Sequence, residues 1–213
     1  ILNLDPPDHT RLRRIVSKSF TPSAMEKLRG RIQQLVDTVL DAAHDRGSIE
    51  LIDDLAFPVP FQVISDLLAM PTKRAEEMRE WSQIITNSLE PTATDEELAQ
   101  SDAAVAQLVP YLTSIIEERR KNLGDDMLSS LITAEEAGDK MTTDELMAFL
   151  VLLYIAGHET TVNLIGNSTL ALLRHPEQAA IVHQHGLNSQ AIDELLRYDG
   201  PVQHTVRLPL KPV

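Results

Sequence analysis

The sequence contains no cysteine in its 213 residues. The chain can therefore form no disulfide framework, no zinc site of the thiolate kind and no iron–sulfur cluster, because each of these needs cysteine sulfur. The absence by itself does not identify the redox compartment in which the protein works.

Positive charge is also scarce. Lys and Arg together number 19 against 32 Asp and Glu, which gives a formal net charge of −13. Nucleic acids and anionic membranes would repel such a chain as a whole, so we expect neither as its main partner, although a local basic patch is compatible with this composition. A hydrophobic content of 43% is enough for a substantial core in one domain or two small ones. No clear domain boundary divides residues 1–213, which favours one domain.

Long hydrophobic runs are missing as well. The apolar stretch from Leu146 to Gly157 is too short to span a bilayer and is followed by polar residues, so we expect a core helix and no membrane span. The sequence begins at Ile1 and shows neither the basic nor the apolar region of a signal peptide. We expect it to be a segment cut from a longer protein.

Capping patterns and prolines predict a mainly α chain with a little β. Thr142 and Glu145 have capping-box spacing, and nothing stops the helix that begins there before Pro176, so one long helix is predicted over 142–174. Its apolar residues surround the axis from 146 to 155, which places it at the centre of the domain. Further helices are predicted over 8–20, 23–46, 60–70, 73–89, 95–122, 125–138, 176–183 and 189–198, and short strands over 48–52 and 202–208.

The central helix carries polar groups where its pattern predicts burial, in the stretch AGHETT at 156–161. Burying Glu159 would cost several kcal/mol unless it were paired or protonated, and Gly157 costs about 1 kcal/mol of helix propensity. Such costs suggest a use, because an acid can relay protons and a glycine admits another body close to the backbone. A solvated groove at Glu159 and simple packing at Gly157 explain the same residues equally well. A zinc site is disfavoured, since H-E-x-x-H would need a second histidine where Val162 stands, and no metal site is predicted beside His158.

Three stretches in register resemble the cytochrome P450 family. AGHETT resembles the oxygen-activating segment of its central helix, DELLR at 193–197 resembles the E-x-x-R of a later helix, and DPPDHTRLRRIVSKSFTP at 5–22 resembles the segment with which bacterial members hold the haem propionates. Their order and separations match the family over the whole chain. The resemblance implies an incomplete P450-like helical domain built around a long central helix.

The same resemblance implies binding residues for haem b. His9 and Arg13 share a helix face and would reach the propionates, although further basic residues nearby make a solvated basic face the alternative. Arg207 matches a strand arginine that contacts a propionate in many members, with a cross-strand charge as the alternative. Glu194 and Arg197 match a structural ion pair, with an exposed pair one turn apart as the alternative.

Four residues of the central helix receive roles beside the haem. Ala156 and Gly157 would line the oxygen-binding side, where a larger side chain would occupy the space that dioxygen needs. Thr160 would assist oxygen activation through its hydroxyl group, and Glu159 would pass protons inward, so both are candidate catalytic residues.

The missing cysteine bears directly on haem binding. Members of the family bind haem through a cysteine thiolate, which favours O–O cleavage. Because the sequence holds none, we expect that this chain as written does not hold haem stably and does not catalyse monooxygenation. It would then be part of a P450 or, alternatively, a non-catalytic P450-like partner protein that stabilises or activates another enzyme. A generic helical regulatory domain is disfavoured by the ordered motifs.

The resemblance also implies partners and a location. The substrate would be a small to medium apolar organic molecule, with Leu89, Val151 and Leu152 as pocket candidates. A ferredoxin-type donor would supply electrons and could dock on the basic residues of 11–18, unless these form an ordinary solvated face. Soluble bacterial members favour the cytoplasm. Apolar surface left open on the long helix would be covered by another copy or by residues outside this sequence.

Overall fold

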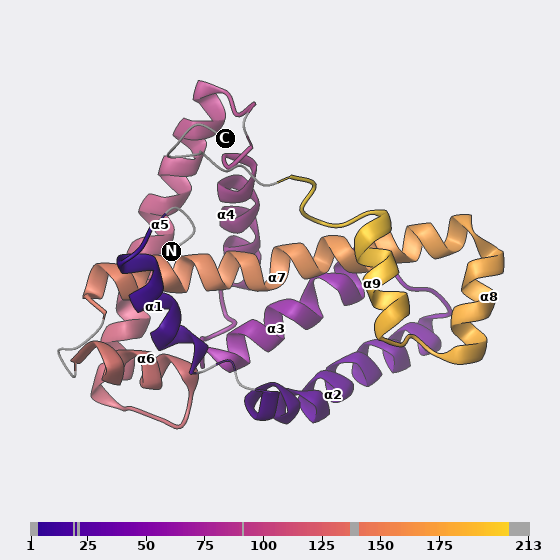
Figure 1. Cartoon of the computed structure of the whole chain (residues 1–213), viewed down its shortest axis with the longest axis horizontal. Coiled ribbons are helices and arrows are strands. Elements are labelled where there is room, and N and C mark those ends of the chain that lie inside the picture. The colour runs from indigo at the N-terminus through magenta and orange to yellow at the C-terminus, as the bar shows by residue number, and fades with distance from the viewer. Residues whose placement is uncertain (1–3, 19, 21, 91, 137–140, 205–213) are drawn as a thin grey trace.

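One long helix organises the molecule, as Figure 1 shows for the computed structural model. The structure describes residues 4–18, 20, 22–90, 92–136 and 141–204. The helix α7 (Thr143–Arg174) begins with a complete capping box. The Glu145 N–H donates to the Thr142 hydroxyl at 3.2 Å, and the Glu145 carboxylate accepts from the Thr142 N–H at 2.7 Å. The predicted start and end of the central helix are confirmed.

The other helices pack along both sides of α7 and at its ends. Helices α2 and α3 lie on one side of it, α4 and α5 stand together on the other, and α8 and α9 fold back near its carboxyl end (Figure 1). Their bounds are α1 (Asp8–Ser17), α2 (Pro22–Arg46), α3 (Pro58–Leu67), α4 (Ala75–Asn87), α5 (Asp95–Lys121), α6 (Met127–Glu136), α8 (Pro176–His185) and α9 (Ser189–Tyr198). The mainly helical class is confirmed.

The strand predicted at 48–52 is not formed. Residues 48–50 are irregular, and Leu51–Ala56 form the π-helical turn η1, with the Phe57 N–H donating to the Ile52 carbonyl at 2.9 Å. The turn packs directly on α7, where a Cβ built on Gly166 would lie 3.2 Å from Ile52 Cδ1. A lone strand has no partner for its backbone groups, and the described residues offer none here, whereas a helical turn satisfies them internally. Of the other predicted strand, 202–204 are irregular and 205–208 lie outside the described residues.

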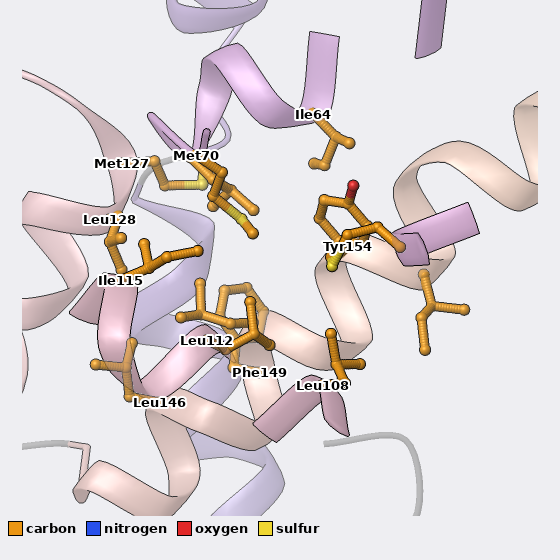
Figure 2. Close-up of a cluster of buried hydrophobic side chains, with 14 of the residues drawn as sticks. Ile64, Met70, Leu108, Leu112, Ile115, Met127, Leu128, Leu146, Phe149 and Tyr154 are labelled. Carbon is orange, nitrogen blue, oxygen red and sulfur yellow. The ribbon is translucent and has the colours of Figure 1, made fainter. Parts of the chain in front are cut away.

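The core forms where α3, α5 and α6 meet the first half of α7 (Figure 2). Leu146 and Tyr154 of α7 are almost fully buried, as are Leu108 and Leu112 of α5 and Leu128 of α6. Burial of side chains of this size stabilises the fold by about 1.5 to 3 kcal/mol each. The predicted central position of the long helix is therefore confirmed for its first half.

By length and composition α7 could also cross a membrane, since an 18-residue window reaches a mean hydropathy of 1.4. The sequence prediction rests only on the shorter run from Leu146 to Gly157. Core helices satisfy the same criterion, and the first half of α7 is used here as protein core. Its second half is more open, and Leu173 is 75% exposed. Further exposed apolar side chains at this end are Leu170, Ile181, Leu187, Ile192, Leu196 and Tyr198.

Helix α1 is attached to the beginning of α7 by an ion pair. The Arg11 guanidinium donates to the Glu145 carboxylate, and the two side chains are 31% and 24% exposed. The hydrogen bond from Arg11 lowers the pKa of Glu145 below its ordinary value. This contact brings the remaining residues of α1 beside α7.

Candidate functional site

The polar segment of α7 presents a small, open surface at Ala156 and Thr160. Ala156 is exposed, and the Thr160 hydroxyl donates to the Ala156 carbonyl at 2.8 Å. Thr161 makes a similar, longer bond to the Gly157 carbonyl at 3.4 Å. Threonine hydroxyls commonly satisfy themselves in this way within a helix. The Thr160 hydrogen is thus held in place, and the hydroxyl oxygen keeps lone pairs with which to accept.

Helix α1 places basic side chains near the beginning of α7. Glu145, which holds α1, and Ala156 are eleven residues apart, about three helical turns, so they lie on nearly the same face of α7. On α1, His9 is partly buried and Arg13 is exposed. Neither side chain has a hydrogen bond or ion pair within the part of the chain that the structure describes. Both could therefore bind an acidic group, and their contact with haem propionates stays a prediction.

Gly157 faces helix α3 and not the open surface. A Cβ built on it would lie 3.0 Å from Ile64 Cδ1 and 3.1 Å from Ile64 Cγ1. The structure thus gives this glycine a packing role between α7 and α3. A contribution to an oxygen-binding surface stays a prediction for Gly157 and has a clearer physical basis at Ala156.

Glu159 is a half-buried acid with a side chain 20% exposed. Burial raises the pKa of Glu159, while a hydrogen bond with Asn163 and the positive charge of Arg79 lower it. Arg79 is itself held by Asp53 at 2.9 Å and lies over the Phe57 ring. A carboxyl group in such a place can stay protonated nearer neutral pH than an exposed one, which suits a proton relay.

His158 is the buried polar residue that sequence reasoning missed, since the sequence motif raised it only as a zinc ligand. It is fully buried, and its Nδ1 lies 2.7 Å from the Tyr154 carbonyl oxygen. Burial lowers the pKa of the imidazole. The signal was available in the sequence, because Leu146, Leu150, Tyr154 and His158 recur at every fourth position and so share one helix face.

The remaining predicted residues lie away from this surface or outside the described residues. Glu194 and Arg197 form a two-fold hydrogen-bonded pair at 2.7 and 2.6 Å on α9, but the side chains are 58% and 69% exposed. In this structure they form the exposed pair that was the alternative interpretation. Arg207 lies outside the described residues. Among the pocket candidates, Leu89 is 69% exposed, while residues 151 and 152 are partly buried.

A mainly apolar pocket lies away from the polar segment. It measures about 490 Å³ and lies between the end of α7 and helices α8 and α9. Its apolar lining includes Ala171, Leu172, Ile181, Val182, Leu195 and Tyr198. The cavity therefore does not identify a substrate site next to Ala156.

The residue types at this surface are compatible with one side of a haem group. The exposed small side chain of Ala156 leaves room for a flat ring, and His9 and Arg13 offer donors to carboxylates. The described residues contain no cluster of His, Asp or Glu that could hold a metal ion, and the sequence has no cysteine. The residue types are compatible with the oxygen-binding side and with propionates, but they do not include a thiolate ligand for iron.

The sequence matches the family of cytochrome P450 over residues 1–189. Cytochrome P450 107B1 of Saccharopolyspora erythraea is 46% identical over 203 residues, which cover 95% of this chain and 48% of that protein. Cytochrome P450 monooxygenase PikC of Streptomyces venezuelae is 41% identical over 218 residues, which cover 100% of this chain and 51% of the relative.

Solved structures agree with these relatives. The crystal structure of the myxobacterial cytochrome P450 CYP267B1 in complex with myristic acid superposes with a TM-score of 0.86 at 42% identity, and the match covers 92% of this chain and 48% of that one. The chain thus spans about half the length of the relatives it matches. Family match, sequence identity and fold together show that this chain belongs to the cytochrome P450 family.

Proposed function

We propose that these residues form the oxygen-activating half of a haem-thiolate monooxygenase. The observation that carries the proposal is the open surface of α7, where the exposed Ala156 and the internally bonded Thr160 lie beside the half-buried acid Glu159. When bound, haem b supplies dioxygen activation at its iron, which a cysteine thiolate favours. The chain's own residues would hold the group, leave space beside it and deliver protons.

Each residue has a limited task in this proposal. His9 and Arg13 donate hydrogen bonds to the propionates, and Ala156 leaves the space that a larger side chain would fill. Glu159 would carry the transferred proton on a carboxyl oxygen, which burial favours by raising its pKa, and would release it toward the surface. The Thr160 hydroxyl oxygen accepts a hydrogen bond, since its own hydrogen is bonded to Ala156.

The thiolate ligand has to be supplied from outside these 213 residues, because the sequence has no cysteine. We therefore propose that the chain as written neither holds haem stably nor catalyses monooxygenation. The similar proteins carry the names of P450 enzymes, among them a monooxygenase and a vitamin D(3) 25-hydroxylase. Those names do not favour the alternative of a non-catalytic partner protein.

The partners follow from the family and from the surface of α1. A small to medium apolar organic substrate is proposed, in keeping with the myristic acid bound by CYP267B1. A ferredoxin-type donor would approach the exposed basic residues Arg13, Arg14 and Lys18, while the charge of Arg11 is balanced by Glu145. The bacterial relatives favour a cytoplasmic protein. Self-association through the open apolar surface stays a prediction.

Haem retention tests the proposed role of α1. The test protein, called the completed enzyme, joins these residues to the cysteine-containing remainder of cytochrome P450 107B1. The change Arg13→Gln is expected to speed haem loss about tenfold, because a charged donor to a propionate is removed. Haem transfer to excess apomyoglobin measures the rate. Arg14→Gln, an exposed arginine of the same helix, is the matched control, and equal rates for both variants would contradict the assignment.

A further inference from the structure

His158 has one ring nitrogen that is buried and without a partner among the described residues. No part of the side chain is exposed, and Nε2 makes no hydrogen bond there. A buried polar atom without a partner costs about 1 to 3 kcal/mol, so its persistence calls for a use or for an occasional partner. None of the roles proposed for the polar segment involves this atom.

The other ring nitrogen fixes the tautomer. A carbonyl oxygen can only accept, so the 2.7 Å contact with the Tyr154 carbonyl requires that Nδ1 carries the hydrogen. In a neutral ring, Nε2 then presents a lone pair. The ring cannot easily turn, because it has edge contacts with Phe57, Phe61 and Tyr154 at centroid distances of 6.0, 5.9 and 5.3 Å. Nε2 is thus a fixed acceptor.

Glu159 lies next to this acceptor. Its Oε2 is 3.9 Å from His158 Nε2, which is too far for a hydrogen bond and within reach of a small rotation of the glutamate side chain. The groups that act on Glu159 are Asn163 of its own helix and Arg79 of α4. Arg79 is shared with Asp53 of η1, which weakens its pull on Glu159.

We propose that His158 is a positioning residue for the proton on Glu159, with Nε2 accepting a hydrogen bond from the protonated carboxyl group. The proton stays on the carboxyl oxygen, and no bond to it is broken. Such a contact would satisfy both the orphaned nitrogen and the buried acid. Burial favours the neutral form of both groups, because it raises the pKa of Glu159 and lowers the pKa of His158.

The inference gives the proton relay of the proposed function a defined starting point. A protonated Glu159 held by His158 would keep its proton away from solvent until the side chain rotates toward the open surface at Thr160. The purpose of the hydrogen bond between Glu159 and His158 rests on the proposed function, but the bond itself requires no haem. The two claims can therefore fail separately.

The test is the acid dissociation constant of Glu159, measured in this chain without haem. The pH dependence of the ¹³Cδ signal of Glu159 reports it directly. The variant His158→Phe keeps the size and ring contacts and removes the acceptor, and we expect it to raise the dissociation constant about three- to tenfold, the worth of one hydrogen bond. The variant His158→Gln places an amide oxygen near the former Nε2, and we expect it to stay within about twofold of the parent.

The outcomes exclude the competing explanations. If burial alone holds the proton, His158→Phe will leave the dissociation constant unchanged or lower it, because the site becomes more apolar. If His158 were a cation, its removal would also lower the constant, and either result would overturn the proposal. The control variant Phe61→Leu alters a ring contact of His158 but keeps its Nε2 acceptor. It should leave the acid dissociation constant of Glu159 unchanged.

A second measurement covers the case in which the phenylalanine variant does not fold, which its backbone amide spectrum would reveal. The ¹⁵N shifts of His158 in the unmodified chain should show hydrogen on Nδ1 and an Nε2 that is shifted by hydrogen bonding when Glu159 is protonated. Hydrogen on Nε2, or an Nε2 signal that ignores the titration of Glu159, would overturn the proposal without any variant. Failure of the completed enzyme to bind haem would bear on the proposed function alone.

Discussion

The change Glu159→Gln in the completed enzyme is expected to lower substrate turnover about a hundredfold. Glutamine keeps the size of the side chain and its hydrogen bonding, but it has no proton to transfer, and general acid catalysis is typically worth about 10² or more. Product formation per minute measures the effect. Oxygen reduced without the proton from Glu159 would take protons from solvent and leave as hydrogen peroxide, so the peroxide released per product formed should rise.

A carboxylate elsewhere on the same helix provides the control. Asp144 lies exposed in the first turn of α7, far from the polar segment, and Asp144→Asn should leave turnover nearly unchanged. If Glu159→Gln also keeps at least half of the turnover, Glu159 is only a solvated acid in a groove. The relay would then have to be assigned elsewhere, and the purpose proposed for His158 would be lost with it.

The change Gly157→Leu is expected to lower the free energy of unfolding by about 1 to 3 kcal/mol, the usual cost of overpacking. The physical reason is the 3.0 Å approach of a Cβ at this position to Ile64. Alanine should be nearly neutral, because about 1 kcal/mol of helix propensity offsets a small movement of the flexible Ile64 side chain. Urea unfolding of the chain, followed by circular dichroism, measures both changes.

A double-mutant cycle shows whether Ile64 is the cause. The change Ile64→Ala should itself cost about 2 to 5 kcal/mol, since the side chain is buried, but it makes room for the new leucine. In combination the two changes should therefore cost less than their sum. Strictly additive changes in the free energy of unfolding would show that contact with Ile64 of α3 does not limit the side chain at position 157. Gly30→Leu, at a helix position where an added Cβ would meet nothing within 4 Å, should stabilise the chain slightly.

The sequence predicted the central helix well because local signals agreed. Thr142 and Glu145 form the capping box that their spacing indicated, and Pro176 follows the end of the helix. Its first half is buried, as the apolar pattern required. Signals of this kind depend on neighbours in sequence and are therefore readable without tertiary structure.

Contacts between segments far apart in the sequence explain where the sequence prediction falls short. Residues 51 and 52 end the strand predicted over 48–52, yet in the structure they begin η1, which packs on α7 at Gly166. Gly157, whose place beside the haem stays a prediction, also packs against Ile64 of α3, from a segment almost a hundred residues away. The order of residues in a motif does not show which side of a helix is covered.

The candidate site was predictable as a list of residues and not as an arrangement. Ala156 is exposed, Glu159 is partly buried and Thr160 is bonded to the Ala156 carbonyl, while their roles beside the haem stay predictions. The contribution of His158 depends on which ring nitrogen meets the Tyr154 carbonyl, and only the structure shows this contact. The attachment of α1 through Arg11 and Glu145 is likewise a contact between distant segments.

The ferrous–carbon monoxide spectrum tests the central claim most directly, because thiolate-ligated haem has a strongly red-shifted band. It should be recorded for this chain incubated with haem and for the completed enzyme prepared in the same way. The proposal predicts the red-shifted band in the completed enzyme and its absence in the 213-residue chain. The band in the chain itself, or a folded completed enzyme that binds no haem, would contradict it.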